Sequence, residues 1–208
     1  MSCLRRFVFA AIAALASAAL HAEVPPPAPA VVISSADGAQ ASVRIEGGHV
    51  GIIRGTRAGF DADAVHLVGE ARGDKRYYFR MPAREAVFEV KFGEDGFKLR
   101  TPAGKLLWKV KIAADKIKVS DNEENANAWA LKTDYADKAK LVDPAGKEAG
   151  EVKFGATGGK AKLKDAAGAT RFVIESGKPC AACAVLLADG VPEEARWVIL
   201  AELLARGS

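Results

Sequence analysis

The stretch Phe97–Ile112, FKLRTPAGKLLWKVKI, decides the fold because its pattern occurs three times along the chain. It returns as AKLVDPAGKEAGEVKF at 139–154 and as AKLKDAAGATRFVIE at 161–175. In the segment LLWKVKI, apolar residues such as Trp108 and Val110 alternate with Lys109 and Lys111. A period of two places the apolar side chains on one face and the lysines on the other. Each repeat therefore predicts a pair of antiparallel strands with one buried and one wet face.

The joints between the paired strands predict tight turns. The repeats share a glycine, at Gly104, Gly146 and Gly168, where a positive φ is needed, and a proline precedes it in two of them. Asp143 and Asp165 stand where a turn begins and can accept a backbone N–H. A type I turn closed by a bulge would require this arrangement.

The same alternation and turn signals recur along the chain and predict a meander of about twelve short strands. A longer echo, EVKFGEDGFKLRTPAG against EVKFGATGGKAKLKDAAG, indicates a pairwise internal repeat. A single sheet of this length would leave an apolar face open, so it must fold over or close. The expected strands are 43–46, 49–54, 64–68, 76–80, 86–92, 97–100, 106–112, 116–120, 128–132, 138–142, 148–154 and 160–175, the last of which can be two.

Two C-terminal segments favour a barrel over a sandwich. CAACAVLLA at 180–188 has no polar side chain on any side, and a helix that is apolar all round is buried or in a membrane. A bilayer needs about 20 apolar residues, so nine cannot span it. In VPEEARWVILAELLAR at 191–206, Pro192 and two following glutamates are typical of a helix start. The predicted fold is mainly β: an antiparallel meander closed into a barrel, with a buried apolar C-terminal helix and a second short helix.

The N-terminus predicts export. Arg5 and Arg6 precede an apolar run of fourteen residues that ends at small residues, which is typical of a secretory signal peptide cleaved near Ala22. The segment EVPPPAPA that follows is typical of a stiff, extended leader. The expected organisation is a signal peptide at 1–22, a Pro/Ala-rich leader at 23–42 and a β-barrel domain with C-terminal helices at 43–208. The protein is thus expected in the periplasm or outside the cell.

Charge is concentrated in the repeats. Residues 97–178 hold 17 basic and 11 acidic residues, a net charge of +6, whereas the rest of the exported chain is slightly acidic. Such a block can favour an anionic membrane surface or a protein partner, or it can be a solvated lysine-coated face. Nucleic acid is not expected as a partner, since the chain lacks basic residues interleaved with stacking aromatics. The candidate binding residues are Lys109, Lys111, Lys116, Lys118, Lys140, Lys153, Lys162 and Lys164.

Residues 43–204 resemble the tubby-like family, specifically its LURP-one-related branch. The resemblance rests on many short strands joined by D-x-x-G-K turns, alternating lysine and apolar residues, and an apolar C-terminal helix. It implies a twelve-stranded barrel threaded by that helix, and a lipid or membrane-surface association. The chain departs from the family in its signal peptide and in a second helix after Gly190. None of the family's phosphoinositide-binding residues is matched to a position here.

Cys180 and Cys183 form the sharpest short motif, CxxC. The spacing allows a disulfide, and a thiol at a helix start is acidified by the helix dipole. A thioredoxin-like function would need a βαβ setting, haem attachment would need a following histidine, and zinc would need further ligands. The sequence therefore leaves two readings, a pair of small buried residues or a possible disulfide.

The remaining short motifs are more typical of ordinary loops than of functional sites. The loop 120–127 resembles a calcium loop but lacks its glycine and its final acid, and 155–161 resembles a phosphate loop but has no Ser or Thr after Lys160. His49 and His66 stand without neighbouring ligands, and the acids Asp61 and Asp63 lie in a polar segment. No metal, cofactor or catalytic residue is predicted. The favoured function is non-enzymatic binding of a partner or an anionic membrane through the lysine face; the alternative is a carrier of a small apolar ligand inside the barrel.

The predicted topology distinguishes two substitutions. Leu186→Asp should abolish folding, because an unpaired charge buried in an apolar segment costs several kcal/mol. Lys153→Glu should be tolerated, because Lys153 is expected on the wet face of its strand. Thermal melting followed by circular dichroism would compare the two variants, and equal melting behaviour would contradict the topology.

Overall fold

The computed structural model describes residues 31–36, 40–45, 49–55, 66–133, 137–154, 161–176 and 180–206. Side chains are described from residue 66 onward within these ranges, up to Ile174 in the last strand and again from Cys180. The predicted signal peptide and the prolines of the predicted leader lie outside the described residues.

Eleven consecutive strands form an antiparallel meander, in which each strand pairs with the next along the chain. This confirms the mainly β, meandering fold that the alternation predicted. Their bounds are β4 (His66–Arg72), β5 (Lys75–Arg80), β6 (Glu85–Gly93), β7 (Gly96–Arg100), β8 (Leu106–Ile112), β9 (Lys116–Ser120), β10 (Trp129–Lys132), β11 (Lys138–Val142), β12 (Glu148–Phe154), β13 (Ala161–Asp165) and β14 (Thr170–Ser176).

Three further strands precede the meander: β1 (Val31–Ala36), β2 (Gln40–Ile45) and β3 (His49–Gly55). β1 pairs with β4 and β3 pairs with β14, so these strands lie between the two ends of the meander. β1 and the start of β2 fall within residues 31–42, which the sequence assigned to a leader. The prolines end before Val31, and VVISS is rich in residues that favour strands, so this part of the leader pairs as strand.

The period of two is confirmed in the burial of the strands. Leu99 and Leu131 are among the inward-facing residues that are fully buried, while their sequence neighbours on the other face remain accessible. Val90 is fully buried as well, but of its two outward-facing neighbours only Lys91 is exposed, since Glu89 is buried. Trp108 and Ile112 share the inward face of β8 with the buried Val110 but stay partly exposed. One face of the sheet therefore carries the hydrophobic core.

The three predicted turns are confirmed in detail. Gly104, Gly146 and Gly168 have φ of +90°, +84° and +81°, and each donates its N–H to the carbonyl at the start of its turn at 2.8–3.0 Å. Oδ1 of Asp143 and of Asp165 accepts backbone N–H groups from within its turn at 2.8–3.0 Å. A register shift follows in each hairpin, as a type I turn with a bulge requires.

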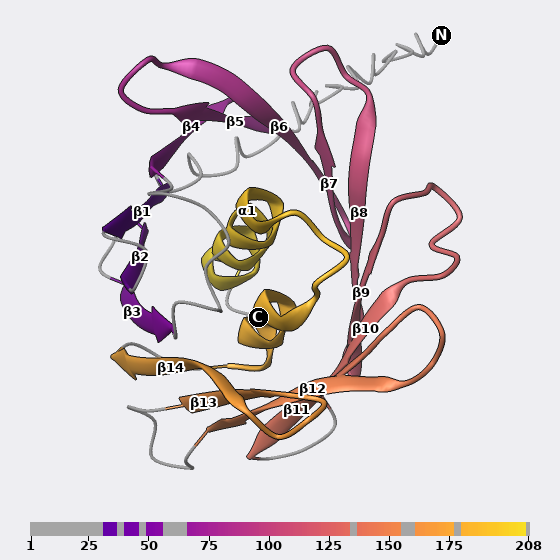
Figure 1. Ribbon diagram of the computed structural model, residues 1–208. Coiled ribbons are helices and arrows are strands. Elements are labelled where there is room, and N and C mark those ends of the chain that lie inside the picture. The colour runs from indigo at the N-terminus through magenta and orange to yellow at the C-terminus, as the bar shows by residue number, and fades with distance from the viewer. Residues whose placement is uncertain are drawn as a thin grey trace, which may run out of the picture.

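Two helices follow the last strand, and both are buried as predicted. The first, η2 (Ala181–Leu187), is a 3₁₀ helix, and the second, α1 (Glu193–Ala205), is a 13-residue α-helix with Pro192 at its N-cap. The prediction that the second helix is short is wrong, since it is the longer of the two; the first ends after seven residues, before the turn around Gly190. Figure 1 shows both helices on the concave side of the curved sheet.

Gly150 of β12 lets the sheet approach η2 closely. A Cβ atom on Gly150 would lie 2.8 Å from Cδ1 of Leu187 and 2.5 Å from the carbonyl oxygen of Lys164 on the neighbouring strand. Both distances are too short for carbon, and the carbonyl belongs to the backbone, which cannot rotate away. The contact between the first helix and the meander therefore depends on this glycine.

We expect Gly150→Ala to lower the free energy of unfolding by about 1–3 kcal/mol, the usual range for forcing an extra carbon into a packed core. Gly93→Ala is the control, because its Cβ would find its nearest neighbour at an ordinary 3.7 Å. Urea unfolding measures both, and equal stability of the two variants would show that η2 does not rest on β12 in this way.

Candidate functional site

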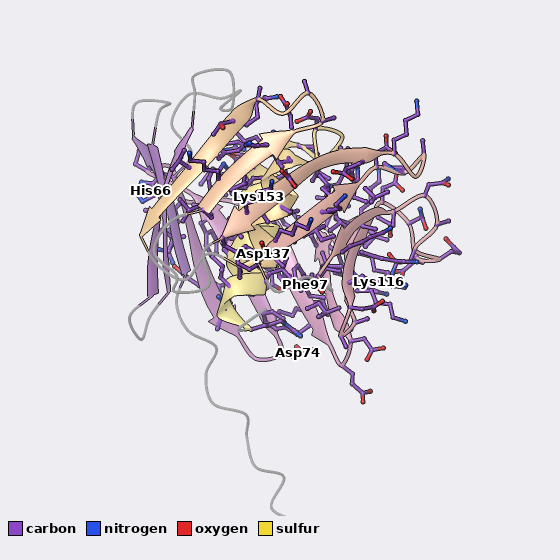
Figure 2. All side chains as sticks on the ribbon, turned by 90° about the horizontal axis from the view of Figure 1, so that it is seen from below. His66, Asp74, Phe97, Lys116, Asp137 and Lys153 are labelled. Carbon is purple, nitrogen blue, oxygen red and sulfur yellow. The ribbon has the colours of Figure 1, made fainter. Side chains whose placement is uncertain are left out.

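The eight lysines predicted as binding residues all lie on the outer face of the sheet, where each is exposed or half-buried. They come from β8, β9, β11, β12 and β13. Side chains on this part of the sheet project away from the ribbon, and Lys116 and Lys153 mark two of the strands involved (Figure 2). The helices occupy the other face, so the lysines and the core are separated by the sheet itself.

The strand registers align lysines directly opposite one another. On β6, β7 and β8, Lys91 pairs with Lys98, and Lys98 pairs with Lys109. Lys75 on β5 stands opposite Lys91 and extends the row across a fourth strand. Like charges directly opposite each other destabilise a sheet, by an amount within the roughly 0.2–1 kcal/mol of such pairs. The row therefore has no stabilising purpose of its own within the fold.

Two more lysine rows lie further along the meander. Lys132 on β10 stands between Lys116 on β9 and Lys140 on β11. Lys153 on β12 stands between Lys138 on β11 and Lys162 on β13. Five members of the rows, Lys75, Lys91, Lys98, Lys132 and Lys138, were not among the predicted residues. Only the strand register shows which lysines are neighbours.

Acidic residues neutralise part of this face. Glu123 binds Nζ of Lys98 at 2.7 Å, Glu148 binds Lys140 at 2.6 Å and Glu151 binds Lys153 at 3.1 Å. The hydrogen bond from Lys98 lowers the pKa of Glu123 below its ordinary value. Lys75 is also paired, with Glu89 at 3.1 Å. Seven other lysines of the face have no ion-pair partner within the described residues: Lys91, Lys111, Lys116, Lys118, Lys132, Lys162 and Lys164.

Shallow hollows interrupt this outer face. One of about 270 Å³ lies over β6, β7 and β8, and another of about 360 Å³ lies beside β12 and β13. Lysines line both, including Lys109 in the first and Lys153 in the second. Neither hollow is lined by a described residue of η2 or α1, and the lysines that line both belong to the outer face.

Cys180 and Cys183 lie at the start of η2 as free thiols, where the sequence left a disulfide open. Cys183 is buried and Cys180 is half-buried. A hydrogen bond between the two side chains lowers the pKa of Cys180 and, together with burial, raises the pKa of Cys183. In the structure the pair thus lies as two hydrogen-bonded thiols, and the possible disulfide stays a prediction.

The remaining predicted candidates are not brought together. In the loop 120–127, Ser120 donates to Oδ1 of Asn125 at 2.6 Å and Asn122 donates to the carbonyl of Ala126 at 2.9 Å, so its polar groups bond to one another. His66 is exposed on β4, and within the described chain no cluster of histidine, cysteine or acidic side chains is placed to hold a metal. The side chain of His49, the pair Asp61 and Asp63, and residues 155–160 lie outside the description.

A buried polar cluster, which no sequence pattern indicated, joins the helix to the sheet. The hydroxyl of Tyr78 on β5 donates to Oε1 of Glu202 on α1 at 2.6 Å, and Nε of Arg76 lies 3.4 Å from the same oxygen. All three side chains are at most 1 % exposed. Desolvation raises the pKa of Glu202, against the opposing effect of Arg76, and raises the pKa of Tyr78 well above its ordinary value.

Two further contacts, one near each end of α1, fix the position of this helix together with the cluster. Further along the chain, the guanidinium of Arg206 lies 5.3 Å from the ring centre of Phe92 and 5.8 Å from that of Phe97, which places the helix end against β6 and β7. Near the other end, Arg196 donates to the carbonyl of Leu186 at 2.7 Å and so ties α1 to η2. Arg196 and Glu202 are buried, so these two charged residues hold the helix in the core, whereas Arg206 is exposed at its end.

Comparison with known proteins gives no relative: no family model, curated protein or solved structure matches the chain. The resemblance to the tubby-like family therefore stays a prediction. In the part of the chain that is described, no helix is long and apolar enough to cross a membrane.

The pKa of Glu202 predicts a pH-dependent stability. Because folding raises this pKa, Glu202 contributes its full share of stability at pH values below its pKa in the unfolded chain. That stability is lost as the pH rises through the pKa in the folded protein. The loss is about 1.4 kcal/mol for each pH unit that separates the two pKa values. We expect the free energy of unfolding of the natural protein to fall over this interval relative to Glu202→Gln, which does not titrate. Urea unfolding from about pH 4 upward tests this; parallel curves for the two proteins would refute it.

Proposed function

We propose that this protein is an exported, non-enzymatic β-barrel protein that binds a partner or an anionic membrane surface through its lysine-rich outer face. The observation that carries the proposal is the alignment of lysines in rows across neighbouring strands, such as Lys91, Lys98 and Lys109. An isolated fold gains nothing from like charges placed opposite each other. An anionic surface laid over them turns that repulsion into attraction.

The proposed barrel is supported by the strand order: β1 pairs with β4 and β3 pairs with β14, the two ends of the eleven-strand meander, and β2 pairs with both β1 and β3. A barrel leaves no unpaired edge, so the strands would not recruit further strands from other chains. Its outer face would then be the surface on which a partner binds. Export is supported by the charged and apolar N-terminal segment at 1–22.

The contents of the interior support binding on the outside rather than in the lumen. Val185 and Leu186 of η2 and Ile199 and Leu200 of α1 are at most 2 % exposed and pack in one core cluster with the strands. The polar residues of α1 are likewise engaged, since Glu202 binds Tyr78. The helices thus use the apolar face that a small ligand would need.

The strength of the proposed attraction can be judged from the number of free lysines. A basic residue close to an anionic membrane contributes about 1 kcal/mol, and the effect fades within a Debye length, about 10 Å at 0.1 M salt and about 3 Å at 1 M. Several lysines without acidic partners lie on neighbouring strands, for example Lys111 and Lys118, which stand directly opposite each other. Their sum is enough for binding that is reversible and sensitive to salt.

Cosedimentation of the purified protein with vesicles tests this function. We expect binding to phosphatidylcholine vesicles that contain phosphatidylglycerol, loss of binding between about 0.1 M and 1 M salt, and no binding to phosphatidylcholine alone. The double variant Lys153→Glu/Lys162→Glu should bind about tenfold or more weakly, because it reverses two neighbouring charges of one row.

The matched control is Lys105→Glu/Lys147→Glu, which changes the net charge equally but at exposed turn positions outside the rows. It should retain most of the binding. Equal losses in both variants would mean that only net charge matters, and binding that is absent or indifferent to salt would reject the membrane as target.

A further inference from the structure

Basic residues are concentrated around the hollow over β6, β7 and β8. Its volume is about 270 Å³, and Asp95 is the one acidic residue among the described residues that line it. The basic residues that line it are Lys91, Lys98, Arg100, Lys109 and Lys111. Five cations around one shallow recess form a local field that a flat row of lysines does not provide.

The backbone creates the recess. β6 and β7 are joined by a two-residue turn, and the carbonyl of Asp95 in that turn accepts the N–H of Ile112 on β8 at 2.7 Å. Gly96 then lies so close to β8 that a Cβ atom would stand 2.0 Å from the carbonyl oxygen of Val110. Because residue 96 has no side chain, the floor between Lys98 and Lys111 remains open.

Two of the five cations are already engaged by one acid from outside the lining. Glu123, in the loop between β9 and β10, lies 2.7 Å from Nζ of Lys98 and 3.8 Å from Nζ of Lys109. Lys109 also donates to the backbone carbonyl of Glu123. Lys91 and Lys111 have no such partner within the described chain and are exposed.

We propose that this hollow is a binding site for a polyvalent oxyanion, a phosphorylated or sulfated group, and that the carboxylate of Glu123 competes with this ligand for Lys98 and Lys109. Lys91, Lys111 and the planar guanidinium of Arg100 bind the anion directly, and Arg100 can do so through two parallel hydrogen bonds. The inference deepens the proposed function, on which it rests, because it assigns anion recognition to one place on the lysine face.

A competing carboxylate serves the site in two ways. It keeps Lys98 and Lys109 extended over the hollow when no ligand is present, so that fewer side chains have to be ordered on binding. It also sets a threshold, because a monovalent anion gains little over the carboxylate that it replaces, whereas a group with two or more charges gains the additional attraction. The site therefore selects for charge density.

Titration calorimetry with inorganic pyrophosphate tests the site in the full chain. We expect Lys91→Ala/Lys111→Ala to weaken binding about tenfold or more, and Glu123→Gln to strengthen it several-fold by releasing Lys98 and Lys109. The matched control is Lys116→Ala/Lys132→Ala, a pair of opposed lysines on β9 and β10 that does not line the hollow. It should bind pyrophosphate like the natural protein.

Three results would overturn the inference: no pyrophosphate binding, equal weakening in the control pair, or an unchanged affinity in Glu123→Gln. Melting temperatures of the variants show whether a loss reflects unfolding, and Glu123→Gln, whose expected change is a gain, cannot be mimicked by misfolding.

Vesicle binding separates this site from the wider proposal. If pyrophosphate binds in the hollow and also displaces the protein from phosphatidylglycerol vesicles, the ligand is a lipid headgroup. If it binds but vesicles are not bound, the site stands, its ligand is a free anion, and the membrane function fails. If vesicles are bound equally by the natural protein and by Lys91→Ala/Lys111→Ala, the membrane function stands and the assignment to this hollow fails.

Discussion

The arrangement of this protein follows from the need to cover one long apolar sheet face. The meander presents buried residues such as Val90, Leu99 and Leu131 on one side only, and the C-terminal helices supply the apolar surface that packs against them. At about 25 cal/mol for each Å² buried, this contact is the main favourable term of the fold. The close approach of Leu187 to Gly150 shows how little space is left between the two layers.

Burial of the helices brings charged side chains into the core, and each of them contacts a polar group there. Glu202 accepts a hydrogen bond from Tyr78 and lies beside Arg76, while Arg196 donates to the carbonyl of Leu186. A buried ion pair adds little net stability, but the loss of one partner costs about 3–5 kcal/mol because a charge is left alone. These contacts therefore fix where the helix sits more than how strongly it is held.

The same layering leaves function to the outer face. With the interior filled by side chains and the polar groups of the helix engaged there, the lysine rows are the feature of the described chain that the fold does not explain. The lysines that stand opposite one another on β6, β7 and β8 repel each other, which lowers the stability of the fold. The carboxylate of Glu123 reduces this repulsion in part. An anionic partner would relieve it further, which is the physical basis of both proposals.

The sequence by itself determined most of what consecutive residues control, except that it assigned β1 to the leader and made the second helix short. Alternation predicted the strands, the shared glycines predicted the turns and their bulges, and the apolar runs predicted buried helices, because pleat, turn and helix geometry are local. Only the tertiary structure decided which residues meet across long separations. The contact of Tyr78 with Glu202 spans 124 positions, and the contact of Glu123 with Lys98 spans 25. The eight predicted lysines were on the correct face, but their grouping depends on strand register, which no single segment encodes.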